Sequence, residues 1–139
     1  MLASIGYAVA YTGVGIVLLT LGFLVLDLLT PGHLGRQIHE ERSVNAGIVL
    51  AAGFLAQGLV IFSAIWNNAT SGFGEALLYT VVFGVLGVVL QAVAFLVLDL
   101  LTPGKLGRHV TEVSFHPASL VLAAVQLSVA GIVVASTWP

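Results

Sequence analysis

Four long stretches of the chain are apolar and contain no charged residue. They cover residues 1–26, 43–74, 76–98 and 113–139, and the shortest has 23 residues. About 18–20 apolar residues in a helix are enough to cross a hydrocarbon core of roughly 30 Å. We therefore predict an all-α integral membrane protein with four transmembrane helices, at about 5–29, 45–66, 77–101 and 118–138.

The composition excludes the alternative that these helices form the core of a soluble protein. Hydrophobic residues make up 59% of the 139 residues and charged residues only 7%, against roughly 45–50% and about 25% in an ordinary soluble domain. So short a chain has no residues left to cover four apolar helices with a polar surface. A net charge of −2 with four basic residues leaves no surface for nucleic acid. The first apolar stretch has no basic residue before it and continues far past Ala10, so we interpret it as a span and not as a signal peptide.

The cationic residues predict how the spans are oriented. All four lie in two loops, 31–44 and 103–117. Because basic loops stay on the cytoplasmic side of a membrane, we expect both loops in the cytoplasm and both termini outside. The protein would then be a multi-pass membrane protein. The four residues are Arg36, Arg42, Lys105 and Arg108.

The sequence repeats itself at an offset of 72 residues. Segment 23–36 reads FLVLDLLTPGHLGR and segment 95–108 reads FLVLDLLTPGKLGR, so 13 of 14 positions are identical. We predict a single transmembrane domain, 1–139, made of repeats 5–67 and 77–139. Since each repeat has two spans, the repeats would be parallel and related by a pseudo-two-fold axis along the membrane normal.

Small side chains predict how the second helices of the two repeats pack. In a pseudo-symmetric bundle like helices face each other, and small residues permit the close approach from which packing energy in lipid arises. One face of each second helix carries small residues at matching positions. They are Gly47, Ala51 and Gly58 in the first repeat and Ser119, Ala123 and Ala130 in the second. The pairs Ala52–Ala56 and Ala124–Ser128 have the same small-xxx-small spacing.

Both copies of the repeated motif predict a sharp turn after the first helix. Proline cannot continue the helical hydrogen-bond ladder, and glycine permits a positive φ. We expect the first glycine after each proline to make the turn and the second to reverse the chain again. The residues of the two turns are Thr30, Pro31, Gly32 and Gly35, and Thr102, Pro103, Gly104 and Gly107.

Asp27 and Asp99 lie one turn before the end of each first helix. There a carboxylate is close to the negative end of the helix dipole and partly desolvated, so it needs a partner. In one arrangement, which we favour, Arg36 and Arg108 fold back and pair with the acids as a structural clamp. In the other, the acids face water and form an ion or proton site.

Other polar residues give weaker signals. The loop histidines do not recur at the repeat offset, so we expect them to be solvated and predict no metal site. Glutamines within the spans are expected to bond between helices, with a pore lining as the alternative. No nucleotide-binding loop or catalytic triad is present in the sequence, so we predict no cofactor and no enzyme activity. These residues are His33, His39, His109 and His116, and Gln57, Gln91 and Gln126.

Four spans in two copies, with the repeated motif at their inner ends, resemble the domain-of-unknown-function 350 family of small bacterial inner-membrane proteins. The resemblance covers almost the whole chain, and the duplicated acid followed by the Pro-Gly turn is its most specific part. Family members are often encoded near polyamine-synthase-like and phage-shock-type envelope-stress proteins. The resemblance therefore implies a role in envelope stress or membrane homeostasis, and it transfers no catalytic residue to this chain.

The expected function follows from the place of the polar residues. Because they are concentrated in two matched loops, we expect a non-enzymatic component of the lipid bilayer that works as a homo-oligomer or as an anchor for a cytoplasmic partner protein. The alternative is an oligomeric ion or proton channel or transporter, in which Asp27 and Asp99 form the inner mouth.

Overall fold

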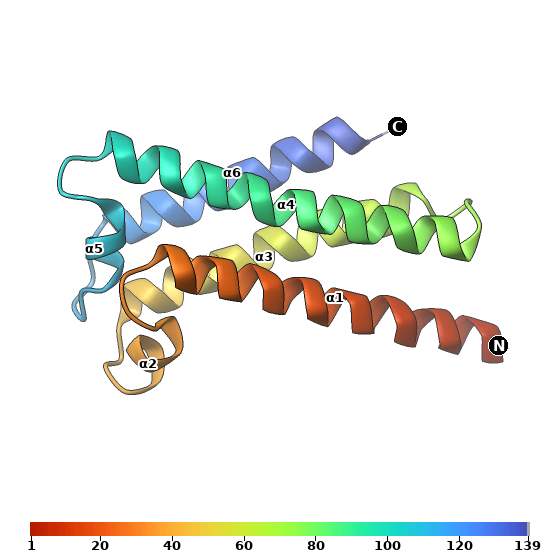
Figure 1. Cartoon of the computed structure of the whole chain (residues 1–139), viewed down its shortest axis with the longest axis horizontal. Helices are drawn as coiled ribbons and strands as arrows, with labels where there is room; N and C mark the ends of the chain where they lie inside the picture. Colours follow the sequence, from red (N-terminus) through yellow and green to blue (C-terminus); the bar gives the residue numbers. More distant parts are fainter. Residues whose placement is uncertain (139) are drawn as a thin grey trace.

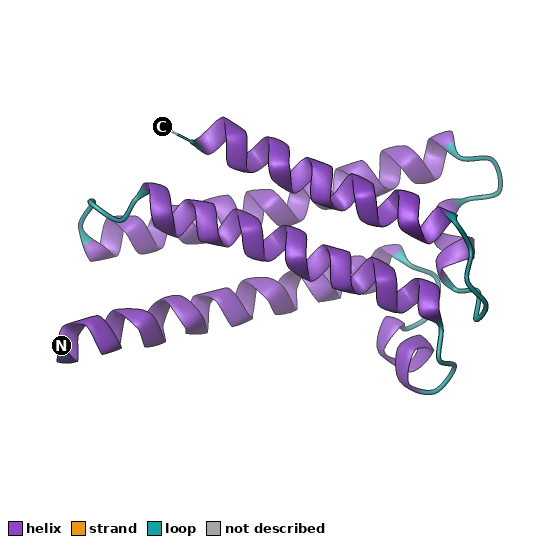
Figure 2. Ribbon diagram, turned by 180° about the vertical axis from the view of Figure 1, so that it is seen from behind, coloured by secondary structure: helices purple, strands orange, loops and turns teal. Residues whose placement is uncertain are grey.

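The computed structural model describes residues 1–138, and Pro139, with which the predicted second repeat ends, lies outside the described residues. All regular secondary structure in the described part is α-helical (Figure 2). Four helices are long and apolar enough to cross a membrane, as predicted. They are α1 (Leu2–Leu29), α3 (Val44–Asn67), α4 (Phe73–Leu101) and α6 (Ala118–Thr137).

Two short helices lie in the segments that were expected to be loops. They are α2 (Leu34–His39) and α5 (Leu106–Val110). Each contributes a fully buried apolar side chain, Leu34 and Val110, and this burial holds the short helix against the bundle. Five or six residues are too few for a helical period to be recognised in the sequence.

The long helices lie side by side, with α2 and α5 together at one end of the bundle (Figure 1). We call this the loop end; the N-terminus and the end of α6 lie at the far end. Helix α3 contacts every other long helix and packs most extensively on α6, while α1 packs on α4. Helices α3 and α4 also pack broadly, whereas α1 and α6 hardly touch.

Of the small residues predicted to pack on α3, those matched between the repeats do not lie on the buried face. Ala51 is exposed, and a Cβ added at Gly47 or Gly58 would meet no atom within 4 Å. Ala52 and Ala56, the small-xxx-small pair predicted on this helix, are buried. The buried face is therefore shifted by one residue, about 100° around the helix. Small residues occur on both faces of α3, so the small-xxx-small spacing does not select between them.

On α6 the predicted face is partly correct. Ser119 and Ala130 are fully buried, and Ala123 is half-buried. Ala124 and Ser128, the small-xxx-small pair predicted to pack on this helix as well, are exposed, so that prediction is wrong. Helix α6 thus presents the predicted side to the bundle, whereas α3 does not.

Two groups of buried apolar residues hold the helices together. The smaller one joins α3 to α6 in the far half of the bundle. The larger one lies toward the loop end and includes side chains of α2 and α5, so this end is packed like a protein interior. Its members are Leu34, Ala46, Val49, Phe95, Val110 and Leu122. Helix α1, by contrast, buries only Leu18 and leaves most of its surface outside the bundle.

Candidate functional site

Each of the duplicated aspartates accepts a hydrogen bond from the backbone beyond the turn. Oδ1 of Asp27 accepts from the N–H of Leu34 at 2.5 Å, and Oδ1 of Asp99 accepts from the N–H of Gly107 at 2.9 Å. Both N–H groups belong to the first turn of a short helix, where no helical carbonyl is available to them. The two carboxylates therefore cap α2 and α5 and hold the preceding turns closed.

The turns begin as the repeated motif predicts. Helices α1 and α4 end at Leu29 and Leu101, and the threonine that follows each has an extended backbone. Gly32 and Gly104 have φ values of +86° and +90°, which a residue with a Cβ adopts only with strain. At Gly32 a Cβ would also lie 2.7 Å from Nε2 of Gln37, whose amide donates to the carbonyl of Pro31.

The second reversal expected at Gly35 and Gly107 is wrong, because both residues are helical, in α2 and α5. In the second repeat a reversal occurs at Lys105, which has a φ of +64° where the equivalent His33 has −110°. The backbone N–H that donates to the aspartate differs in the same way. It belongs to the first residue of α2 in the first motif and to the second residue of α5 in the second motif. Two nearly identical motifs thus close their turns with different backbone paths.

The arginines do not pair with the aspartates. Arg36 lies 3.8 Å from a carboxylate oxygen of Glu40 and 3.5 Å from one of Glu41, all on the surface of the loop end. Arg108 makes no salt bridge within residues 1–138. The clamp we expected is built from backbone amides, because the short helices direct their first N–H groups at the acids and their arginines at the solvent.

The glycines at equivalent places in α2 and α5 provide a matched pair of variants. A Cβ at Gly107 would lie 3.0 Å from Cδ of Pro31, whereas one at Gly35 would meet nothing within 4 Å. Alanine favours a helix over glycine by about 1 kcal/mol. We expect G35A to raise the thermal unfolding midpoint slightly and G107A to lower the free energy of unfolding by about 1–3 kcal/mol. Circular dichroism in detergent follows the unfolding of both variants. Equal effects of G35A and G107A would contradict the packing of α5 against Pro31, in the turn after α1.

Asn45 joins the two loop segments and has no counterpart in the second repeat. Its side chain is fully buried, and its Nδ2 donates to the carbonyls of Glu112 at 2.9 Å and Ser114 at 2.6 Å. Its Oδ1 accepts from the N–H of His116 at 2.7 Å. One side chain thus satisfies three backbone groups of the segment between α5 and α6. Sequence reasoning missed this role because the repeat offset places Pro117 at the equivalent position.

Ser43 extends the same junction. Its Oγ donates to the carbonyl of Glu112 at 2.7 Å and accepts from the N–H of Ala46, which makes Ser43 the N-cap of α3. A serine directly before a long apolar stretch is a recognised helix-start signal. That signal locates the cap in the sequence, but it does not predict the contact with the other repeat.

His109 and His116 are half-buried and stacked, so the expectation of solvated histidines is wrong for this pair. Their ring centroids are 4.1 Å apart and their planes differ by 11°. Glu112 lies beside them, and one ligand atom from each of the three residues lies within 4.8 Å of the others. The lone pairs of stacked rings lie in parallel planes, so in this arrangement they do not converge on one ion. Nδ1 of His116 instead accepts from the N–H of Ala118 and caps the start of α6.

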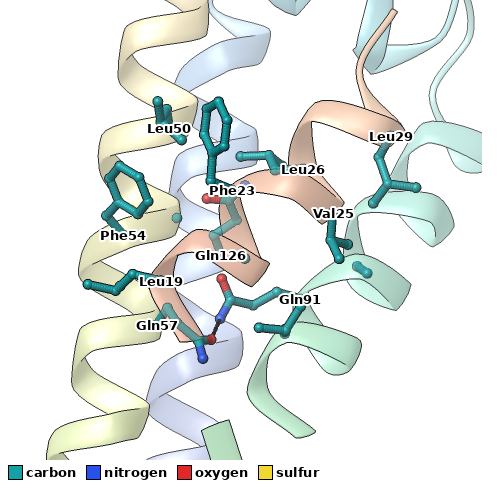
Figure 3. Close-up of a pocket in the computed structure, with 14 residues that line it drawn as sticks. Leu19, Phe23, Val25, Leu26, Leu29, Leu50, Phe54, Gln57, Gln91 and Gln126 are labelled. Carbon is teal, nitrogen blue, oxygen red and sulfur yellow. Dashed lines mark hydrogen bonds between the residues drawn. The ribbon is translucent and has the colours of Figure 1, made fainter. Parts of the chain in front are cut away.

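Three glutamines from α3, α4 and α6 meet inside the bundle (Figure 3). Nε2 of Gln57 donates to the carbonyl of Gly84 at 2.8 Å, and Nε2 of Gln91 donates to Oε1 of Gln57 at 2.9 Å. These are the interhelical bonds that the sequence predicts. Gln126 is 3% exposed, and its Oε1 is buried without a hydrogen-bond partner.

Comparison with known proteins identifies relatives of this chain along most of its length. A family model described as Domain of Unknown Function (DUF350) matches residues 1–137. A UPF0719 transmembrane protein of Mycolicibacterium paratuberculosis is 39% identical over 128 residues, which are 92% of this chain and 84% of that protein. UPF0719 transmembrane proteins of Mycobacterium bovis and Mycobacterium tuberculosis are 34% identical over the same shares. No solved structure matches the chain.

Proposed function

This chain belongs to the DUF350 family, and from that premise we propose that it is a non-enzymatic membrane component that presents a fixed surface to a cytoplasmic partner protein. Its four apolar helices and its transmembrane relatives make it a multi-pass membrane protein in contact with the lipid bilayer. We call the proposed surface the loop face. It consists of the exposed residues of segments 31–44 and 103–117, including α2 and α5.

The observation that carries this proposal is the set of three hydrogen bonds between Asn45 and the segment between α5 and α6. They tie the two repeats' loop segments into one unit. Seven of the ten charged residues lie in this unit, so most of the charge available for recognition is there. A surface that is already ordered loses little conformational entropy when a partner binds.

The orientation and the symmetry are parts of the same proposal. The basic residues of the loop face support a cytoplasmic location, with both termini outside. The packing of first helix on first and second on second supports two parallel repeats, 5–67 and 77–139, about an axis along the membrane normal. The exposed surface of α1 supports contact with a further copy of the chain in a homo-oligomer. The family resemblance supports a partner from envelope stress or membrane homeostasis.

A channel or transporter built on the aspartates is the weaker alternative. An ion or proton site requires carboxylate oxygens that face water. Oδ1 of Asp27 and Oδ1 of Asp99 are instead engaged by backbone N–H groups, and the side chain of Asp27 is only 21% exposed.

Photo-cross-linking in native membranes tests the proposed function. A photoreactive residue is placed at Glu40 on α2, at Arg108 on α5, or at Thr70 in the exposed loop at the far end. We expect the same cross-linked protein from both loop-face positions and none from Thr70. N45A should weaken both cross-links because it removes three of the hydrogen bonds that hold the segment between α5 and α6. No cross-link from either loop-face position, or cross-links that N45A leaves unchanged, would contradict the proposal.

A further inference from the structure

The two repeats carry the residues of one helix contact twice, but the bundle contains this contact only once. Helix α4 lies directly against α3 at Gly87, where a Cβ would be 2.9 Å from Cγ1 of Val60. Val60 is only 2% exposed. The repeat offset of 72 residues places Gly15 of α1 and Ile132 of α6 at the equivalent positions. A Cβ at Gly15 would meet no atom of the described chain within 4 Å, and Ile132 is 68% exposed.

The side chains around each pair differ in the same way between the repeats. One face of α4 is buried and consists of small residues, whereas the equivalent face of α1 is small but exposed or half-buried. The residues are Ala76, Thr80, Gly84 and Gly87 on α4, and Ser4, Ala8, Thr12 and Gly15 on α1. Likewise, one face of α3 is buried and the equivalent face of α6 is exposed. The residues are Val49, Ala56, Val60 and Ser63 on α3, and Val121, Ser128, Ile132 and Ala135 on α6.

The arrangement of the four long helices explains why the contact forms once. Each helix packs on two neighbours, in the order α1, α3, α6, α4 and back to α1. Of the two pairs that lie across this arrangement, α3 and α4 pack broadly, while α1 and α6 hardly touch. When one diagonal pair of four helices is in contact, the other pair is held apart. The equivalent contact of Gly15 with Ile132 is therefore possible only between two copies of the chain.

We propose that α1 of one copy packs against α6 of a second copy, with the partner subunit's Ile132 seated on Gly15. Helices α1 and α6 run in opposite directions, as α3 and α4 do, and an axis along the membrane normal keeps equivalent residues at the same depth. Close packing on small residues is a main source of helix association in lipid. This interface joins two different faces, so further copies can add until a ring closes. The inference rests on the homo-oligomer of the proposed function and names the faces by which its copies meet.

Disulfide cross-linking tests this interface, because the chain has no cysteine of its own. V60C/G87C is the positive control: its two Cβ atoms would be 3.4 Å apart, close to the 3.5–4.5 Å that is usual for a disulfide, so the bond should form within one chain. G15C/I132C in native membranes, treated with a mild oxidant, should instead form bonds between copies. A non-reducing gel should then show a ladder of dimers and larger species.

Gly13 provides the matched control for position 15. It is exposed and lies two residues away, about 200° around α1, so G13C/I132C should give no ladder. The inference is overturned if G15C/I132C gives no ladder, or if G13C/I132C cross-links as strongly. Dimers of the single variant G15C would also overturn it, because they require contact of α1 with α1; a homo-oligomer would then remain, with a different interface. The loop-face cross-links report on the partner protein independently of these results.

Self-association of the protein without cysteines gives a second measurement. Energy transfer between labelled copies in liposomes reports how strongly the copies associate. G15L should weaken this association by about tenfold or more, because a large side chain prevents the close approach of Ile132. G13L should leave the association unchanged. Equal effects of G15L and G13L, or no effect of G15L, would overturn the inference.

Discussion

Replacing Asn45 with alanine should lower the free energy of unfolding by about 2–4 kcal/mol, because three hydrogen bonds are lost at a fully buried position. The carbonyl of Ser114 and the N–H of His116 would lose their partner, and the carbonyl of Glu112 would keep only the bond from Ser43. Denaturant unfolding in mixed micelles, followed by circular dichroism, measures the change.

A second asparagine provides the control for this variant. Asn68 makes one local bond, from its Nδ2 to the carbonyl of Ala64 at 2.8 Å, at the opposite end of α3. N68A should therefore cost no more than about 1 kcal/mol. If N45A were as mild as N68A, Asn45 would not hold the loop segments together.

Replacing both duplicated aspartates with alanine should destabilise the protein more than replacing both with asparagine. Alanine removes the acceptors of the N–H groups of Leu34 and Gly107, and each charge-assisted bond is worth about 1.5–3 kcal/mol. Asparagine keeps an acceptor oxygen at the same place and loses only the charge, so about half of the contribution of these two hydrogen bonds should be retained. Thermal unfolding of the two double variants in one detergent gives the comparison.

The same pair of variants distinguishes between two roles of the aspartates, helix capping and ion binding. D27N/D99N should fold, should retain most of its stability and should leave the ion permeability of proteoliposomes unchanged. If the wild type carried a proton or cation flux and D27N/D99N abolished it while still folding, the two acids would act as a conducting site. If asparagine were as damaging as alanine, the charge itself and not the acceptor oxygen would hold the turn.

The long helices were predictable because each contains a mainly apolar stretch of at least 20 residues without a charge, a signal that nothing else in the sequence gives. The ends of α1 and α4 were predictable because proline and a glycine with positive φ act locally. The short helices α2 and α5 were not, since their formation depends on burial of Leu34 and Val110 against distant helices. The helical conformation of Gly35 and Gly107 was not predictable either, for the same reason.

The candidate site was likewise predictable only in part from the sequence. The repeat identified Asp27 and Asp99 as a pair with one role, but it did not reveal that backbone amides would be their partners. Asn45 has no counterpart in the other repeat, so comparison of the two repeats does not indicate its role. The buried face of α3 was misplaced by one residue because alanine and glycine lie on both of its faces. In each case, the missing information is which distant group a side chain meets.

The central claim is that the two loop segments form one fixed face, and amide hydrogen exchange at His116 tests it most directly. Its N–H donates to the buried Oδ1 of Asn45, although it lies in a segment outside the helices. In the purified protein in lipid nanodiscs, we predict slow exchange at His116, and fast exchange at the same amide in N45A. Fast exchange at His116 in the wild-type protein would contradict the account.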